Sequence, residues 1–364
     1  MGLVNNLRYN LVSAALTLPA FKKVKKTAVK LLLGHNKIIG WENSLPVRSL
    51  IIPAEYSPAF IKSTARLYNS GRYDLHYPGL ATLSITGKCD CSCSHCTAYG
   101  GQVKDLSTSQ WIDVIRQSMD LGVFSFGFTG GEPLLRDDLA EIISAVDKRN
   151  ASCVIYTNGS KLKERVKELH KAGLKRILLS IDFADEKSHN QHRNHSGLME
   201  KALLGLEEAK RLGLLVGFST FVSPQRFYSG ALEQIFKLGI EKKVNEIAVF
   251  DALPSGRLED QEELKSLPSK YKLELRQFIE SWWNKKNAPG IWWYGHFRSY
   301  QACGCPGGTS MFNVSADGQF RPCDFCKTSV GSITKDDLLT LWIKLNNLAK
   351  EKRSKGCECW LLRK

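Results

Sequence analysis

The chain has 364 residues, of which 43% are hydrophobic and 24% are charged, as in a folded protein with one large domain and smaller appendages. Its formal net charge is +15, and residues 1–41 contain seven basic and no acidic residues. Eleven cysteines are too few for a disulfide scaffold of this length, and all but Cys153 cluster in two regions. Such clustering indicates metal binding in a reducing compartment, so we exclude a disulfide-rich secreted protein and expect a cytoplasmic one.

Residues 1–41 form a basic segment in which apolar residues recur at helical spacing, with an interruption at Pro19. No apolar run reaches the ~20 residues that a membrane-spanning helix needs. An apolar face beside a lysine-rich face is typical of a helix in a membrane interface, which predicts peripheral contact with the inner face of the membrane. The alternative is a helix packed on the main domain with solvated lysines. Nucleic-acid binding is disfavoured because no known module appears.

Residues 42–80 contain four prolines and are predicted to form an irregular lead-in. Six strand-like runs then alternate with helical patterns. Strands are expected at 81–86, 123–129, 152–157, 176–182, 214–222 and 246–251, and helices at 109–121, 137–148, 161–172, 198–212 and 229–239. This alternation predicts an α/β fold with parallel strands and crossover helices over residues 81–258. Barrels of this kind place their chemistry at the carboxyl ends of the strands.

Three cysteines follow the first expected strand. Cys89, Cys93 and Cys96 have the spacing C-x3-C-x2-C in a short loop. A [4Fe–4S] cluster normally takes four cysteines, so three thiolates leave one iron open for chemistry. Zinc ligation is the alternative for such a loop. Cys91 cannot begin a second C-x3-C-x2-C pattern, because the residue four positions beyond it is His95 and not cysteine. We interpret Cys91 as a spare thiol.

A Gly-Gly-Glu sequence follows the second expected strand. Glycine lets a backbone approach a ligand closely, and the carboxylate of Glu132 can accept an ammonium group. Together with the three cysteines, this arrangement resembles the radical S-adenosylmethionine (radical SAM) enzymes. The resemblance implies a partial (β/α)6 TIM-like barrel, a [4Fe–4S] cluster whose open iron binds SAM, and a 5′-deoxyadenosyl radical that abstracts hydrogen from the substrate.

The resemblance continues at the ends of the later strands, although Phe183 stands where the family usually has glycine and Asn190 where it usually has aspartate. The fork-shaped guanidinium of Arg193 suits the SAM carboxylate. Asp182 either contacts SAM as well or faces the substrate. The SAM-binding residues that the resemblance implies are Gly130, Gly131, Glu132, Asn158, Ser180, Asp182, Arg193 and Ser219.

Six more cysteines lie in residues 301–364. Cys305 and Cys323 bracket an expected β-hairpin, and a helix is expected at 338–348, which together resemble a SPASM/twitch-type α+β auxiliary-cluster domain. Two four-cysteine clusters would need eight ligands, so we expect one auxiliary [4Fe–4S] cluster, with a zinc ribbon as the alternative. The preferred ligands are Cys305, Cys323, Cys357 and Cys359, with Cys326 as their main rival and Cys303 as a spare.

The sequence leaves the substrate open. Residues 259–300 are predicted to be a helical, aromatic-rich connector, either a seam between domains or the wall of a substrate pocket. With the basic N-terminus, this connector favours an apolar substrate such as a lipid. The alternatives are peptide modification by a maturase-type enzyme and a non-catalytic iron–sulfur or zinc protein. The radical SAM resemblance also implies an electron donor such as flavodoxin or ferredoxin.

Overall fold

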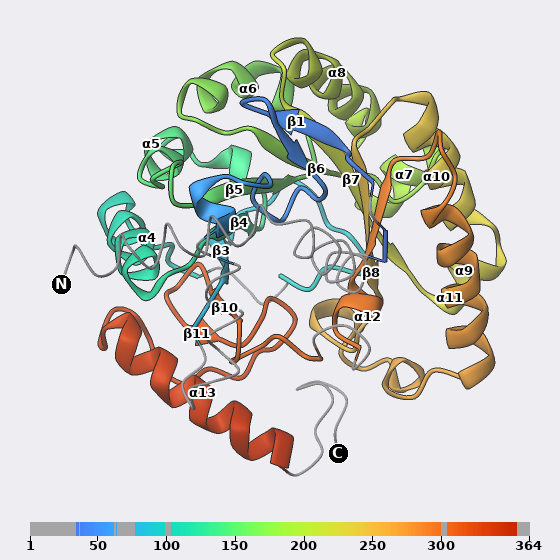
Figure 1. Ribbon diagram of the computed structural model, residues 1–364. Helices are drawn as coiled ribbons and strands as arrows, with labels where there is room; N and C mark the ends of the chain where they lie inside the picture. The colour runs from blue at the N-terminus through green and yellow to red at the C-terminus, as the bar shows by residue number, and fades with distance from the viewer. Residues whose placement is uncertain are drawn as a thin grey trace, which may run out of the picture.

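The computed structural model (Figure 1) describes residues 34–35, 37–61, 63, 77–98, 103–299 and 304–354. Residues 1–33 lie outside these ranges, and so does the helix predicted there. Cys303, Cys357 and Cys359 also lie outside the described residues.

A nine-stranded sheet forms the centre of the molecule, in the order β11-β10-β3-β4-β5-β6-β7-β8-β9. All neighbours from β10 to β9 pair in parallel, and β11 is antiparallel to β10. The six predicted strands are confirmed as β3 (Leu80–Thr86), β4 (Ser125–Gly130), β5 (Ser152–Thr157), β6 (Arg176–Ser180), β7 (Leu215–Val222) and β8 (Glu246–Asp251). The sheet curves into the partial barrel that Figure 1 shows.

Helices cover the outer side of the sheet. The five predicted ones are α4 (Thr108–Leu121), α5 (Leu139–Ser144), α6 (Leu162–Lys171), α8 (Leu198–Arg211) and α10 (Ala231–Glu241). Three more are α7 (Glu186–Arg193), α9 (Pro224–Tyr228) and α11 (Ser269–Trp283). Successive strand residues point to opposite faces, so one set, including Phe126, Phe128 and Phe218, packs under the helices while the other lines the barrel interior.

Two segments extend the barrel beyond the six predicted units. The connector contains β9 (Gly290–Trp293), which pairs in parallel with β8 and leads into α12 (Tyr294–Phe297). The predicted C-terminal hairpin is present as β10 (Met311–Val314) and β11 (Phe320–Arg321), followed by α13 (Leu338–Ser354). Because β10 pairs with β3, this hairpin continues the barrel sheet instead of forming a sheet of its own.

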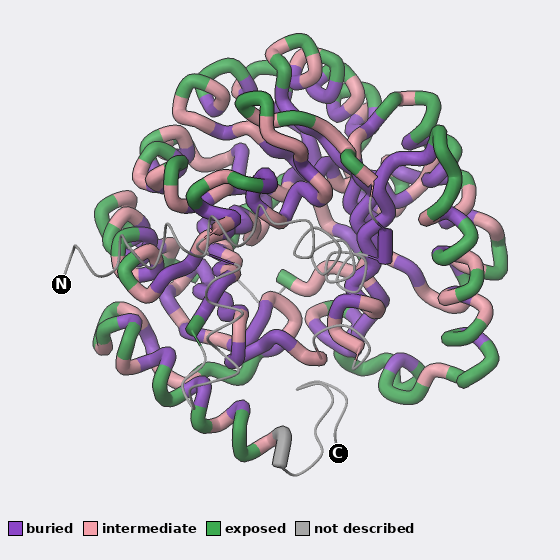
Figure 2. Tube along the Cα trace, in the orientation of Figure 1, coloured by how far each residue is buried: buried purple, intermediate pink, exposed green. Residues whose placement is uncertain are grey.

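The lead-in closes the amino-terminal end of the barrel. A hairpin of β1 (Gly40–Glu42) and β2 (Leu45–Val47) crosses in front of β6 and β7 in Figure 1. Val47, Leu50 and Ile51 then turn inward and bury in the barrel interior, and Figure 2 shows the buried interior of the barrel and its exposed outer helices. The interior therefore has a floor at this end.

Two charged side chains hold this floor. Arg176 donates hydrogen bonds to the carbonyls of Leu50 (3.2 Å) and Ile52 (2.5 Å) and forms an ion pair with Glu42 (2.9 Å). Glu246 accepts the backbone N–H of Leu50 at 3.0 Å. Burial raises the pKa of the Glu246 carboxyl to about 7. The floor is thus fixed to the first residues of β6 and β8.

None of the helices in the described part of the chain combines the length and the apolar character needed to cross a membrane.

Candidate active site

The cysteine loop follows β3 at the carboxyl end of the barrel, and its position depends on close contact with the end of β4. The N–H of Gly131 bonds the carbonyl of Thr86, and the N–H of Glu132 bonds that of Lys88, both at 2.7 Å. A Cβ atom on Gly131 would lie 2.0 Å from the Lys88 carbonyl oxygen, so only glycine permits this approach. Gly130 also has a φ of 128°, a conformation that favours glycine.

The loop is also held from the far side of the barrel. The N–H of Arg257 bonds the carbonyl of Cys96, and the Arg257 guanidinium bonds that of Ser92, both at 3.0 Å. A Cβ on Gly256 would lie 2.1 Å from the Cys96 oxygen. The Ser92 N–H in turn bonds the carbonyl of Arg193 at 3.0 Å. Sequence reasoning missed this support after β8, because Gly256 and Arg257 have no signature of their own.

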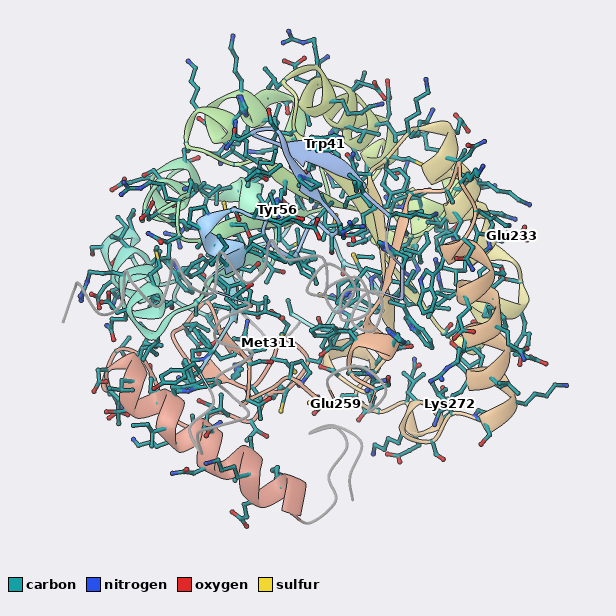
Figure 3. The ribbon with its side chains drawn as sticks, viewed as in Figure 1. Trp41, Tyr56, Glu233, Glu259, Lys272 and Met311 are labelled. Carbon is teal, nitrogen blue, oxygen red and sulfur yellow. The ribbon has the colours of Figure 1, made fainter. Side chains whose placement is uncertain are left out.

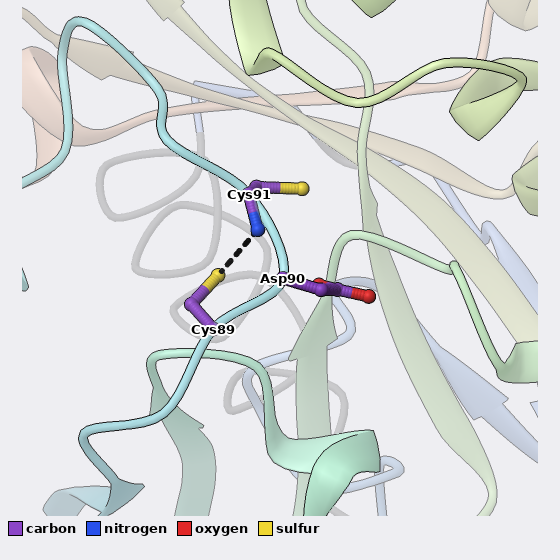
Figure 4. Close-up of side chains that lie close together, drawn as sticks. All are labelled: Cys89, Asp90 and Cys91. Atoms are coloured by element: carbon purple, nitrogen blue, oxygen red, sulfur yellow. Dashed lines mark hydrogen bonds between the residues drawn. The ribbon is translucent and has the colours of Figure 1, made fainter.

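Cys89, Cys93 and Cys96 line one cavity of about 280 Å³, and no disulfide links the cysteines that the structure describes. Cys91, predicted to be a spare thiol, lies among them, and its N–H bonds the Cys89 sulfur at 3.4 Å (Figure 4). The Cys91 thiol also hydrogen-bonds the sulfurs of Cys89 and Cys93, which lowers the pKa of both groups, that of Cys93 to about 7. Two of the three thiols are thereby biased toward the thiolate that metals bind.

Glu132 is fully buried behind this loop. Its carboxylate accepts bonds from the Thr157 hydroxyl (2.6 Å) and from the N–H groups of Asn158 (2.7 Å) and Leu134 (3.0 Å). Burial raises its pKa to about 7, although these bonds oppose the shift. Glu132 therefore joins β4 to β5, a structural role that the sequence did not reveal, while it still lines the cavity.

Asn158 connects the third strand end to the cysteine loop. Its amide nitrogen bonds the Asp90 carboxylate at 2.7 Å and the Cys91 sulfur at 3.2 Å. The predicted turn at the end of β5 is thus brought to the site.

Asp182 and Arg193 form a buried ion pair at 2.6 Å beside the loop. Burial alone would raise the pKa of the Asp182 carboxyl, but the positive charges of Arg193 and Arg226 outweigh it and hold the pKa below its usual range. His95 stacks on Phe221, with ring centroids 4.0 Å apart, and its Nδ1 lies 2.8 Å from Nε2 of His192. Burial lowers the pKa of His95 to about 3, so this imidazole is neutral.

Ser180 is the last residue of β6, whereas Ser219, expected at a strand end, lies within β7 beside it, and their hydroxyl oxygens are 3.4 Å apart at the cavity wall. The structure thus brings all eight predicted SAM-side residues to one cavity, together with the three cysteines.

The auxiliary-cluster region contributes to the same cavity. Cys323 and Cys326 are buried next to each other, with the Cys326 N–H bonded to the Cys323 carbonyl at 3.3 Å. Between them, Asp324 and Phe325 line the cavity, and Cys305 lies half-buried. Sequence reasoning predicted these cysteines but missed the two residues between them. The spacing of the cysteines does not show which way the loop that carries them faces.

The cavity wall between the two cysteine regions is aromatic. Phe250, Trp292 and Tyr294 come from β8, β9 and α12, and the Phe250 ring centroid lies 5.5 Å from that of Trp292 and 5.8 Å from that of Tyr294. The Tyr294 ring lies 5.4 Å from that of Phe325. Trp282 points outward and packs on Phe236, so the predicted aromatic connector supplies both a seam and a pocket wall.

Residues 83–225 match the family model described as the radical SAM superfamily. An AdoMet-dependent heme synthase of Methanosarcina barkeri is 27% identical over 293 residues, covering 73% of this chain and 82% of the relative. The chain belongs to the radical SAM superfamily. The sporulation killing factor maturation protein SkfB of Bacillus subtilis is 26% identical over 306 residues, 80% of this chain and 72% of SkfB.

Solved structures of this superfamily share the fold. Streptococcus suis SuiB bound to precursor peptide SuiA superposes with a TM-score of 0.62 at 18% identity, covering 83% of this chain and 74% of SuiB. The enzyme anSMEcpe with bound AdoMet has a TM-score of 0.57 at 20% identity, covering 74% of this chain and 82% of that one. The α/β class and the partial barrel are confirmed.

This chain is therefore a radical SAM enzyme, which rules out the non-catalytic alternative. Its cofactors are a [4Fe–4S] cluster and SAM, with the auxiliary cluster that SPASM/twitch-type relatives carry. The residues present fit the first of these groups, because three thiols on one braced loop line a cavity that also holds an acidic–basic pair and two hydroxyls.

Proposed function

We propose that this radical SAM enzyme modifies an apolar or aromatic side chain of a peptide substrate. The observation that carries the proposal is the aromatic cavity wall, which lies between the cysteine loop and the Cys323–Cys326 loop. When bound, the cluster and SAM supply a 5′-deoxyadenosyl radical that abstracts hydrogen from the substrate. The protein's own task is then to place one substrate C–H bond next to the cysteine loop and to exclude water.

In this proposal Cys89, Cys93 and Cys96 hold the first cluster. Asn158, Ser180, Ser219 and the Asp182–Arg193 pair bind the polar parts of SAM. Cys305, Cys323 and Cys326 belong to the auxiliary site, for which Cys357 and Cys359 remain predicted ligands outside the described residues.

An uncharged side chain suits the electrostatics of the cavity. Its described lining contains four carboxyl groups and one arginine, and that arginine is paired with Asp182. Burial raises the pKa of the Asp324 carboxyl to about 6, as expected for an acid with little compensating charge. A substrate with several carboxylates would meet repulsion here.

Two of the relatives and structural neighbours named above support a peptide substrate. SkfB is named as a maturation protein, and SuiB was solved with its precursor peptide. The AdoMet-dependent heme synthases support a second candidate, a haem precursor. The acidic cavity argues against this candidate, because haem precursors carry acidic side chains.

The test is transfer of deuterium. Protein reconstituted anaerobically with iron and sulfide would be given SAM, a reductant, and a peptide encoded beside its gene that is deuterated at its apolar and aromatic residues. We expect deuterium in the 5′-deoxyadenosine and a changed peptide mass. Deuterium transfer from a labelled haem precursor, with none from the peptide, would instead select the second candidate.

A variant pair ties the result to the cavity wall. Phe250→Leu removes an aromatic ring from the wall, so peptide turnover should fall while substrate-free SAM cleavage continues. Phe227→Leu is the matched control, because that phenylalanine packs in the outer aromatic cluster against Tyr271 and Phe278. Equal losses in both variants would disconnect the wall from substrate binding.

A further inference from the structure

The end of the barrel opposite the cysteine loop has features that catalysis does not use. We call it the basal face and define it as the β1–β2 hairpin together with the loops entering β6 to β9, residues 172–175, 212–214, 242–245 and 284–289. The hairpin is fixed there, because the Asn245 amide bonds the carbonyl of Ile39 at 2.7 Å and Gly40 packs on Leu215. The basal face lies at the starts of the strands, whereas the active-site cavity lies at their ends.

Large apolar side chains are exposed on and beside this face. Trp41 on β1, labelled in Figure 3, is 61% exposed, and Ile38 next to the hairpin is 46% exposed. Ile38 shares a shallow groove with Ile240 of α10, which is 37% exposed. Single exposed apolar residues are ordinary, but a tryptophan and two isoleucines at one end of a barrel are typical of a binding surface.

Basic residues surround these apolar side chains. Lys243 and Lys286 line the groove that Ile38 and Ile240 share. Lys171 and Lys175 flank the loop entering β6, and Lys171 is exposed. Lysines are also favoured at helix carboxyl ends by the helix dipole. That effect accounts for some of the charge but not for the exposed Trp41 and Ile38 beside it.

The basic N-terminal segment joins the chain at this same face. Gly34 packs against Trp283 at the end of α11, and the Lys37 ammonium bonds the carbonyls of Lys285 (2.7 Å) and Ala288 (3.1 Å). Residues 1–33 contain six basic and no acidic residues. The sequence segment with membrane-interface character is therefore continuous with the basal face.

We infer that the basal face docks on an anionic phospholipid bilayer. Trp41 and Ile38 would enter the headgroup region, where tryptophan is favoured, and the lysines would lie over anionic lipids. Nucleic acid would use the lysines but would leave the isoleucines without a partner. Docking in this orientation turns the cavity away from the bilayer. Membrane contact would then not imply a lipid substrate, although the basic N-terminus suggested both.

The test is co-sedimentation of the full chain with vesicles of phosphatidylcholine alone or mixed with phosphatidylglycerol. We expect binding to the mixed vesicles that weakens as salt is raised. Lys243→Glu with Lys286→Glu should weaken binding about tenfold or more, because each lysine near an anionic surface contributes substantially. The matched control is Lys163→Glu with Lys167→Glu, an identical charge change at two exposed positions on the side of α6.

A second variant tests the apolar contacts. Trp41→Asp should weaken binding at every salt concentration, whereas Leu273→Asp, a change at a 57% exposed position on α11, should not. Unchanged SAM cleavage shows that each variant is folded. Vesicle binding that survives both basal variants would assign the contact to residues 1–33 alone and overturn the inference. Binding of RNA without binding of the mixed vesicles would overturn it as well.

Discussion

Cys91 and Cys93 are two residues apart on one loop, yet their thiols have different surroundings. The Cys91 thiol lowers the pKa of the Cys89 and Cys93 thiols, and the side-chain amide of Asn158 donates to the Cys91 sulfur at 3.2 Å. Its pKa is raised, because its proton is shared with both neighbours. The raised pKa keeps Cys91 protonated beside the predicted ligands.

This difference yields a prediction at the residue scale. Cys93→Ala should lower the iron content after anaerobic reconstitution by about four atoms per chain and abolish SAM cleavage, because the cluster would lose one of three thiolates. Cys91→Ala should retain both, since the C-x3-C-x2-C set stays intact. Iron analysis and 5′-deoxyadenosine release measure the two effects. Retained cleavage in Cys93→Ala, or its loss in Cys91→Ala, would contradict the ligand assignment.

At the scale of elements, the glycines after β4 decide where the cysteine loop lies. Gly131→Ala would place a Cβ atom within 2.0 Å of the Lys88 oxygen, so the loop must move away from β4. We expect cluster occupancy and SAM cleavage to fall at least about tenfold, because displacements of about 1 Å can have effects of this size.

Gly213→Ala provides the control for Gly131→Ala. Gly213 has a φ of 80° and no neighbour within 4 Å of an added Cβ, so its substitution strains the backbone far from the loop. Spectra of the bound cluster in the two variants compare the effects. An equal loss of the cluster in both variants would show that Gly131→Ala acts by general destabilisation and not by moving the cysteine loop.

The floor of the barrel gives a pH-dependent prediction. The Glu246 pKa rises from 4.5 to about 7 on burial, so the folded chain holds a proton there that the unfolded chain has lost. Glu246 therefore makes stability fall as pH rises from about 4.5 to about 7. Glu246→Gln should remove this fall. The free energy of unfolding of the variant, compared with that of the wild type, should therefore be higher at pH 8 than at pH 5 by roughly 3 kcal/mol.

Thermal melting of the metal-free protein across this pH range measures the Glu246 effect. Glu241→Gln, at an exposed position at the end of α10, is the control and should leave the pH profile unchanged. A wild-type profile parallel to that of Glu246→Gln would show that this carboxyl titrates normally in the folded protein.

Elements were predictable from the sequence where periodicity and length agreed. All six predicted strands are present, because each combines a buried apolar run with a following helix. Strand β9 was missed, since Gly290–Trp293 is four residues long and its aromatic content indicated only a connector. The pairing of β10 with β3 joins Met311 to Leu80, and no local signal encodes a partner so distant in the chain.

The candidate site was predictable where its residues form a short pattern within one stretch of sequence. Cysteine spacing and Gly-Gly-Glu are local, so they could be placed before the structure was known. Asp324 and Phe325 could not, because they reach the cavity only through the way the hairpin packs on β3. The buried bracing role of Glu132 likewise depends on Thr157, which is 25 residues away.

At the scale of the whole molecule, the C-terminal region is part of the barrel and not a removable appendage. Phe312 and Phe320 stack with centroids 4.7 Å apart, and Trp342 of α13 packs on Phe312 at 6.1 Å. These residues belong to the same apolar core as β3 and β4. The boundary predicted at residue 301 therefore separates two sequence motifs within one core.

A chain ending at residue 299 should consequently fail to fold as a soluble barrel. Its β3 edge would be unpaired and its core would be open to water, which favours edge-to-edge aggregation. Solubility and limited proteolysis measure the outcome, with a chain lacking only residues 355–364 as the control. A soluble, protease-resistant product ending at 299 would show that the barrel folds without the hairpin.

The closed floor has a consequence for the order of events during turnover. Ile51 seals the amino-terminal end of the cavity that the cysteine loop borders at the other end. Ligands therefore cannot enter the cavity through the amino-terminal end of the described barrel. For ligands that enter past the cysteine loop, the one that lies deeper in the cavity must arrive first and leave last, which is a compulsory-order mechanism. A peptide that lies deeper than SAM would then leave only after 5′-deoxyadenosine and methionine, so release of these products would limit the release of the modified peptide.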